Sequence, residues 1–193
     1  NITGCTACVS VIDEKNKKIY FANAGDSRAV ICKNGLGYQM SHDHKPDSAK
    51  EKNRIYKSGG WVSEGRIKGN LNLSRSLGDF EYKQNKNIGP KDQMITAYPE
   101  INIEIIDDNC EFIILGCDGI WDCLTPQKAC DFVRNRLYNE KTGMVNDIKI
   151  SKIVEEMMDS IISDDINNEF GIGCDNMTCI VIQFKQKNKI IKI

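Results

Sequence analysis

The chain has 193 residues, of which 40% are hydrophobic and 27% charged. This length corresponds to one domain of ~150 residues with a small appendage, and the apolar fraction argues against disorder. Lysine and arginine number 26 against 27 aspartates and glutamates, so a net charge of −1 gives no reason to expect nucleic-acid binding. The apolar runs are far shorter than the ~18 residues of a membrane span, and no N-terminal signal sequence is visible. We therefore expect a soluble globular protein that binds neither nucleic acid nor membrane.

Three apolar, β-prone runs open the chain. They cover residues 5–12, 19–24 and 28–32. A polar turn over 13–18 separates the first two runs, and the tight-turn sequence Gly-Asp-Ser at 25–27 separates the second from the third. This pattern predicts a three-stranded antiparallel meander.

A polar helix is predicted over residues 47–57. It would begin just after Pro46 and stop at the glycine pair 59–60, because proline favours a first helical turn and glycine favours a helix end. Residues 85–93 are polar and contain a Gly-Pro pair, which predicts a loop.

The second half of the chain predicts strands over 101–106 and 112–115, then two helices, then a last strand over 177–184. The first of these helices begins at the N-cap Thr125, and the second has apolar residues at helical spacing over 150–162. Strands early, paired helices late and no regular β-α-β alternation predict an α+β layered protein with mostly antiparallel sheets.

Nine cysteines are present, but only Cys5 and Cys8 have C-x-x-C spacing. No second pair follows at zinc-finger spacing, and neither His42 nor His44 is placed to complete one. Buried, reduced thiols are the simpler interpretation, which indicates a reducing intracellular compartment, the cytoplasm or the nucleus.

Two acidic residues flank predicted strands. Asp118 closely follows the strand at 112–115, and Asp175 closely precedes the last strand. If these strands are antiparallel neighbours, the two carboxylates converge at one sheet edge, where Asp122 and Asp26 could join them. Clustered carboxylates suit Mg²⁺ or Mn²⁺. Each aspartate taken alone is more simply a turn residue, so both interpretations stay open at this point.

Five short motifs occur in order along the chain. They are Asn23-Ala24-Gly25-Asp26-Ser27-Arg28, Asp43-His44-Lys45-Pro46, Leu73-Ser74-Arg75-Ser76-Leu77-Gly78-Asp79, Cys117-Asp118-Gly119-Ile120-Trp121-Asp122 and Asp175-Asn176-Met177-Thr178. Together they resemble the metal-dependent PP2C-type serine/threonine protein phosphatases, over nearly the whole chain. Residues 82–87, 93–95 and 173–174 look most like the gamma-type branch.

The resemblance implies a four-layer α/β/β/α sandwich of two antiparallel sheets, lacking its N-terminal portion here. It implies two Mg²⁺ or Mn²⁺ ions and in-line attack of a metal-bridging water on phosphoserine or phosphothreonine of protein substrates. By motif, Asp118 and Asp175 match ligands of the second metal, while Asp26, Asp118 and Asp122 match a weaker third-metal cluster.

Other residues take their expected roles from the same resemblance. The segment beside the cleft that tunes substrate choice matches Gly59, Gly60, Trp61 and Val62, within a flap region at about 45–98. Residues 1–185 would form the C-terminal part of the catalytic domain, and 186–193 a basic tail. The loop holding His44 is structural in the family. Arg75 could contact phosphate or lie buried in an ion pair, and the ion pair is favoured.

The family's upstream motifs do not occur in this chain. They are an arginine near the phosphate, a Glu-Asp pair, and an Asp-Gly-His segment whose aspartate bridges both metals. The chain also opens without methionine, directly before strand-like sequence. We expect an upstream segment to complete the domain and the chain alone to be inactive. Two rival hypotheses are a non-catalytic pseudophosphatase that binds a partner and a metal-stabilised structural module; the intact carboxylates favour the enzyme.

Overall fold

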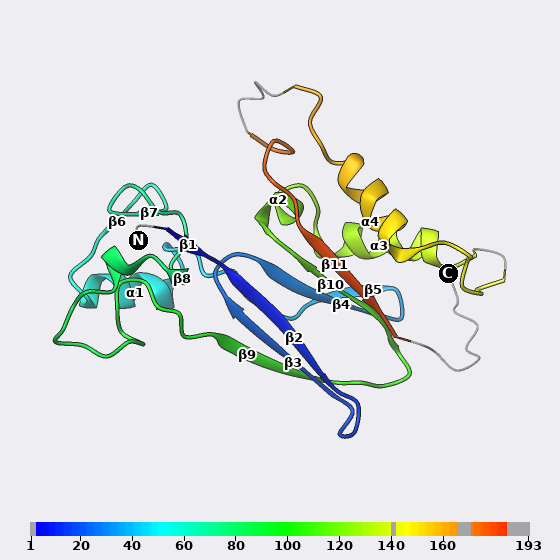
Figure 1. Cartoon of the computed structure of the whole chain (residues 1–193), viewed down its shortest axis with the longest axis horizontal. Coiled ribbons are helices and arrows are strands. Elements are labelled where there is room, and N and C mark those ends of the chain that lie inside the picture. Colours follow the sequence, from blue (N-terminus) through cyan, green and yellow to red (C-terminus); the bar gives the residue numbers. More distant parts are fainter. Residues whose placement is uncertain (1–2, 140–141, 166–170, 185–193) are drawn as a thin grey trace. The chain divides into compact units, whose positions relative to one another are not determined.

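A computed structural model describes residues 3–139, 142–165 and 171–184 of the chain (Figure 1). The predicted basic tail at 186–193 lies outside the described residues. Two compact units form. The first comprises Asn1–Val11, Tyr20–Ser27 and Ser41–Asn102, and the second comprises Ile12–Ile19, Arg28–Met40 and Ile103–Ile193. In the described residues, no helix is both long enough and apolar enough to cross a membrane.

The first unit contains one helix, α1 (Ala49–Lys57), and several short strands. These are β1 (Gly4–Cys5), paired with β8 (Leu77–Gly78), and β6 (Val62–Ser63), paired with β7 (Arg66–Ile67); the 3-10 helix η1 covers Phe80–Tyr82. A small apolar cluster joins α1 to the hairpin and the following loop. Its buried members are Ile55, Ile67, Tyr82, Met94 and Ile95. The helix predicted over 47–57 is confirmed, as is the loop over 85–93.

A three-stranded sheet has the order β2-β3-β9, with β2 at Ala7–Asp13, β3 at Lys18–Ala24 and β9 at Glu100–Ile105. Burial alternates along β9, as expected for a strand with period two. Its exposed positions are all isoleucine: Ile101, Ile103 and Ile105 are 58%, 56% and 62% exposed.

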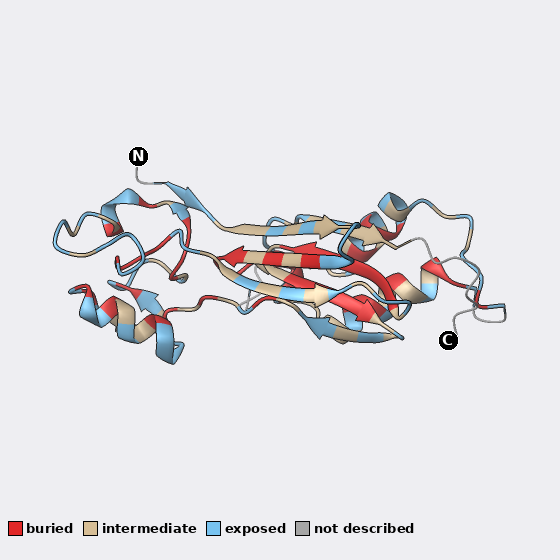
Figure 2. Cartoon of the chain, turned by 90° about the horizontal axis from the view of Figure 1, so that it is seen from below, coloured by how far each residue is buried: buried red, intermediate tan, exposed pale blue. Residues whose placement is uncertain are grey.

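The second unit is built on a four-stranded antiparallel sheet of order β11-β10-β4-β5. Its strands are β4 (Arg28–Lys33), β5 (Leu36–Gln39), β10 (Cys110–Gly116) and β11 (Cys179–Gln183). The helices are α2 (Asp118–Trp121), α3 (Pro126–Leu137) and α4 (Ile150–Asp159). Side chains from α3 and α4 share one apolar cluster with those of β4 and β10, and every residue of β10 is buried (Figure 2).

The antiparallel sheets and few helices confirm the predicted α+β class. The predicted meander is wrong, because the third strand, β4, pairs with β10 and β5 rather than with β3. Its four central residues are all buried, which suits a strand in the interior of a sheet. Strand β5 was not predicted. It follows an Asn34-Gly35 turn in which both residues have positive φ, +49° and +79°.

All nine cysteines are free thiols, and the expectation that they lie in the core holds for some of them. Cys32, Cys110 and Cys130 are buried, whereas Cys5 and Cys174 are exposed. Cys5 lies in the two-residue strand β1, at the start of the first apolar run, and Cys174 lies in a loop.

Candidate metal-binding edge of the four-stranded sheet

The ends of β10 and β11 bring the two predicted carboxylates to one edge. The strands are antiparallel, with Gly116 opposite Cys179, and Cys117 N donates to Thr178 O at 3.2 Å just beyond that pair. Asp118 therefore lies two residues after the end of β10, and Asp175 lies four residues before the start of β11. The antiparallel pairing that the sequence required is confirmed.

Each of these two carboxylates is fixed by the amide that follows it. The Asp118 Oδ1 atom accepts a hydrogen bond from Gly119 N at 3.0 Å, and Asp175 Oδ1 accepts one from Asn176 N at 2.7 Å. Asp118 is partly buried and Asp175 is exposed. We call Asp118 and Asp175 the strand-end carboxylates.

Glycine at position 119 allows the two loops to approach. A Cβ atom added there would lie 2.4 Å from Asn176 O and 3.5 Å from Asp175 Cβ. The first distance is far below any van der Waals contact, so a side chain at 119 would push the two loops apart. The close approach of Gly119 to residue 176 had no signal in the sequence beyond the glycine itself.

Cys117 joins the same two loops through its side chain. Thr178 N donates to its Sγ atom at 3.2 Å, and Sγ donates to Asn176 O at 3.3 Å. These contacts pack the Cys117 side chain between the two loops. Its role in linking the loops was not predicted.

Helix α2 packs against the end of β10. The buried Trp121 donates from Nε1 to Gly116 O at 2.8 Å, and the Arg28 guanidinium carbon lies 5.4 Å from the centre of a Trp121 ring. Asp122 caps this helix, with its N–H donating to Asp118 O at 2.8 Å, and is exposed. Asp122 thus follows Asp118 by one helical turn, as its spacing predicts.

Asp26 belongs to the first unit, in the segment that links β3 to β4. It is only 3% exposed, and its carboxylate accepts a hydrogen bond from Lys45 Nζ. The buried His44 is held against the same turn, with Gly25 N donating to its Nδ1 atom at 3.2 Å. Burial, followed by the charge of Arg75, lowers the pKa of His44, which keeps the ring neutral. This matches the structural role expected for the His44 loop.

The strand-end carboxylates offer the oxygen ligands that a hard divalent cation prefers, but they are too few to fill its coordination shell. Mg²⁺ takes six oxygen ligands in near-octahedral geometry and keeps several waters. Across the residues that the structure describes, no three His, Cys, Asp or Glu side chains form a group able to hold a metal ion. Two carboxylates are fewer than the oxygen ligands that such an ion requires.

Arg75 makes the buried ion pair that the sequence favoured. It contacts Glu51, a residue of α1 that was not singled out from the sequence, and both side chains are at most 5% exposed. Burial by itself raises the pKa of Glu51, but hydrogen bonds from Arg75, Ser74 and Arg54 outweigh it and lower that pKa to about 2. The signal that could have found Glu51 is its spacing of four residues from the buried Ile55, which places both on one helix face.

The predicted flap residues link α1 to the β6–β7 hairpin. Gly59 has φ +91° and ends the helix, and Gly60 N donates to Ile55 O at 2.9 Å. Val62 packs against the small apolar cluster, whereas Trp61 is 47% exposed. A Cβ atom on Gly60 would lie 2.8 Å from the Met94 side chain, so the chain passes closely over the cluster here.

Comparison with known proteins places this arrangement in a family. The family model for protein phosphatase 2C matches residues 1–169. The chain belongs to the protein phosphatase 2C family. It is 47% identical over 187 residues to "Probable protein phosphatase 2C 21" of Arabidopsis thaliana, covering 96% of this chain and 49% of the relative. It is 43% identical over 190 residues to "Protein phosphatase 1G" of Rattus norvegicus, covering 97% of this chain and 34% of the relative.

Solved structures of the family share the fold. The chain superimposes on the crystal structure of a phosphatase from Toxoplasma gondii with a TM-score of 0.73 and 26% identity, over 88% of this chain and 49% of that one. The Toxoplasma gondii phosphatase, like the two relatives, is at least about twice as long as the region that this chain matches. The chain thus spans about half or less of each of these three proteins.

Proposed function

We propose that the chain is the C-terminal part of the catalytic domain of a protein serine/threonine phosphatase, which releases phosphate from phosphoserine and phosphothreonine of protein substrates. The observation that carries this proposal is the placement of Asp118 and Asp175 at neighbouring antiparallel strand ends, in a member of the protein phosphatase 2C family. Two carboxylates at adjoining strand ends are placed to share one cation.

Asp118 and Asp175 would hold one Mg²⁺ or Mn²⁺ ion of a two-ion site. When bound, such ions lower the pKa of coordinated water and neutralise phosphate charge. The residues of this chain supply oriented carboxylates, because backbone amides fix one oxygen of each strand-end carboxylate. Gly119 and Cys117 keep the two loops together at that edge.

An upstream segment of the same domain is the partner that this chain needs. The incomplete ligand shell supports this proposal, since the missing ligands must come from elsewhere. The exposed row of isoleucines on β9 supports it independently, because three adjacent outward apolar side chains are costly in water and favour coverage by another element. Alone, the chain would be inactive.

The flap residues Gly59, Gly60, Trp61 and Val62 would contact the phosphoprotein substrate. Trp61 supports this role, since it leaves a large aromatic surface in solvent on a hairpin whose other apolar residues pack inward. Exposed tryptophan is typical of residues that bind partners.

The test is phosphate release from a phosphothreonine peptide by the complete polypeptide that contains this chain, with Mn²⁺ and with EDTA. The proposal expects turnover in Mn²⁺ that EDTA abolishes. No release from a folded protein loaded with Mn²⁺ would contradict it and leave a binding protein on a phosphatase fold.

A further inference from the structure

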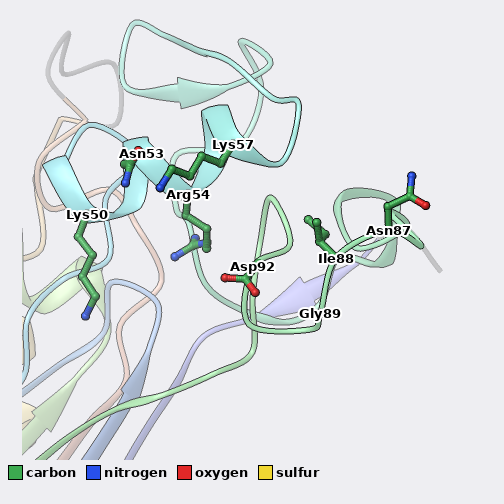
Figure 3. A pocket seen from close by; sticks show the side chains of 8 residues that line it. All are labelled: Lys50, Asn53, Arg54, Lys57, Asn87, Ile88, Gly89 and Asp92. Carbon is green, nitrogen blue, oxygen red and sulfur yellow. The ribbon is translucent and has the colours of Figure 1, made fainter.

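A cavity of about 530 Å³ lies within the first unit, between α1 and the loop at 85–93 (Figure 3). Four of its lining residues come from α1 and four from the loop. They are Lys50, Asn53, Arg54, Lys57, Asn87, Ile88, Gly89 and Asp92. None of these residues has a part in the function proposed above.

The helix wall of the cavity is a single polar face. Lys50, Asn53, Arg54 and Lys57 are spaced i, i+3, i+4 and i+7, which places them in line on one side of α1. Figure 3 shows these four side chains along the helix, with Asp92, Ile88 and Asn87 on the loop across the cavity. A surface helix normally presents such a face to open water, whereas here a second wall stands opposite it.

Hydrogen bonds fix that second wall in place. The buried Gln93 side chain donates from Nε2 to Asn85 O at 2.7 Å and to Ile88 O at 3.1 Å, and its Oε1 accepts from Asn85 N at 3.1 Å. Asn85 Nδ2 donates to Ser58 O at 3.3 Å, which ties the loop to the end of α1. The cavity is therefore built before any ligand arrives.

The two walls are also joined through Arg54. Its Nε atom donates to Gln93 O at 3.0 Å, and its guanidinium is paired with the buried Glu51. Arg54 thus holds the cavity together, and its charge is already engaged.

The lysines provide positive charge that the walls do not neutralise. The side chain of Lys57 has no hydrogen bond or ion pair with any residue in the described parts of the chain. Lys50 is 75% exposed and reaches Glu100 at only 3.4 Å, a weak surface contact. Asp92 is the one acidic side chain that lines the cavity, and it faces the charge of Arg54.

We propose that this cavity binds an extended peptide segment of another protein that carries aspartate or glutamate side chains about three residues apart. Lys50 and Lys57 are separated by seven residues, or about 10 Å along the helix. In the extended polyproline II conformation, which has three residues per turn and a rise of about 3.1 Å per residue, side chains three residues apart lie on one side of the peptide and about 9 Å apart. Two carboxylates would pair with the lysines, and the amides of Asn53 and Asn87 would bind the peptide backbone. Ile88 would contact an apolar residue between the acidic ones.

Carboxylates match this cavity better than phosphoryl groups. The lysines that line the cavity, Lys57 and the weakly paired Lys50, act as separate point charges, and the guanidinium of Arg54 is held by Glu51. Bidentate recognition of phosphate relies on an available arginine.

The experiment is fluorescence anisotropy of a fluorescein-labelled decapeptide with two glutamates three residues apart, added to the complete polypeptide in EDTA. We expect saturable binding that weakens at least about tenfold in the K50Q/K57Q variant and weakens between 50 and 200 mM salt. The matched control is K15Q/K52Q, which removes the same charge from an exposed turn and from the other face of α1 and should bind as the parent does.

Three results would overturn the proposal. Equal binding by K50Q/K57Q and the parent would show that the lysines do not hold the peptide. Equal binding of a peptide with glutamines in place of the glutamates would remove the charge requirement. Tighter binding of the peptide with two phosphoserines, by tenfold or more in the parent and lost in K50Q/K57Q, would reassign the cavity to phosphoryl groups. Because EDTA removes any metal, none of these results depends on phosphatase activity.

Discussion

Arg75 donates two hydrogen bonds to the buried carboxylate of Glu51, from Nε to Oε2 at 3.0 Å and from a terminal nitrogen to Oε1 at 2.6 Å. Ser74 Oγ donates to the same carboxylate at 2.6 Å, and Arg54 contacts it from the next turn of α1. One carboxylate thus satisfies two guanidinium groups. This network fixes the loop that carries the Ser-Arg-Ser-Leu-Gly-Asp motif to α1.

Replacing Glu51 with glutamine should strongly destabilise the protein. The variant leaves two buried guanidinium groups without a counter-charge, which costs about 3–5 kcal/mol in comparable buried pairs. Urea denaturation of the complete polypeptide measures the change. The control is Lys52→Gln, on the neighbouring position of α1, where an exposed ion pair with Asp47 is worth well under 1 kcal/mol. A Glu51→Gln variant as stable as this control would refute the assignment.

Stability should fall in two stages on acidification. Burial lowers the pKa of His44, so the unfolded chain takes up a proton below pH ~6.5 that the folded protein resists. The pKa of Glu51 is about 2 when folded and 4.5 in its ordinary state, so its contribution, roughly 3 kcal/mol, is complete above pH 4.5 and is lost as pH falls towards 2.

Urea denaturation at pH 7.0, 5.5 and 4.0 separates the two stages. His44→Gln should remove most of the loss between pH 7.0 and 5.5, because glutamine does not titrate. An unchanged slope in that variant would mean that His44 is protonated in the folded protein as readily as in the unfolded chain.

Gly119→Ala should disturb the strand-end carboxylates. Its Cβ would lie 2.4 Å from Asn176 O, so the loops before and after it must move, at about 1–3 kcal/mol. Mn²⁺ binding to the complete polypeptide, measured by calorimetry, should weaken accordingly. Gly89→Ala is the matched control, since its Cβ would approach nothing closer than Asp92 Oδ2 at 3.8 Å. Equal metal affinity in both variants would count against the close packing of this edge.

The sequence predicted what depends on local pattern and failed where pairing partners are distant. Helix α3 begins at Pro126, after the expected N-cap Thr125, whose side chain accepts from Lys128 N at 3.2 Å. Strand β4 was recognised as a strand, but its pairing with β10 joins segments about eighty residues apart. No local pattern specifies such a partner, and the intervening turn at 25–27 suggested a hairpin instead.

In the candidate site, too, some residues could be predicted from local sequence and others could not. Asp118 and Asp175 could be found because they flank two recognisable strands, and the antiparallel pairing of β10 and β11 followed from that hypothesis. Glu51 was not identified as the partner of Arg75, because a glutamate in a polar helix looks like a solvated residue, and its spacing from the apolar Ile55 was the one local indication of its burial. The lysine face of α1 was likewise indistinguishable from an ordinary exposed face until the loop opposite it was placed.

Trp61→Ala should weaken substrate binding. Trp61 is 47% exposed, so about half of its surface is buried, and its loss should cost about 2 kcal/mol, less than the loss of a core tryptophan. The KM for a phosphothreonine peptide should rise several-fold in the complete polypeptide. Tyr56→Ala, which removes an exposed aromatic ring from α1, is the control and should leave KM unchanged. The same KM in both variants would remove Trp61 from substrate binding.

The most direct test of the phosphatase proposal compares Asp118→Asn with the parent polypeptide in Mn²⁺-dependent phosphate release from a phosphothreonine peptide. Asparagine keeps the size of the side chain and removes its charge, so we expect a rate loss of at least about a hundredfold and a higher Mn²⁺ requirement. Asp159→Asn, an exposed carboxylate at the end of α4, is the control and should retain full activity. A folded Asp118→Asn protein with the parent's rate and Mn²⁺ dependence would contradict the assignment of Asp118 to the metal site.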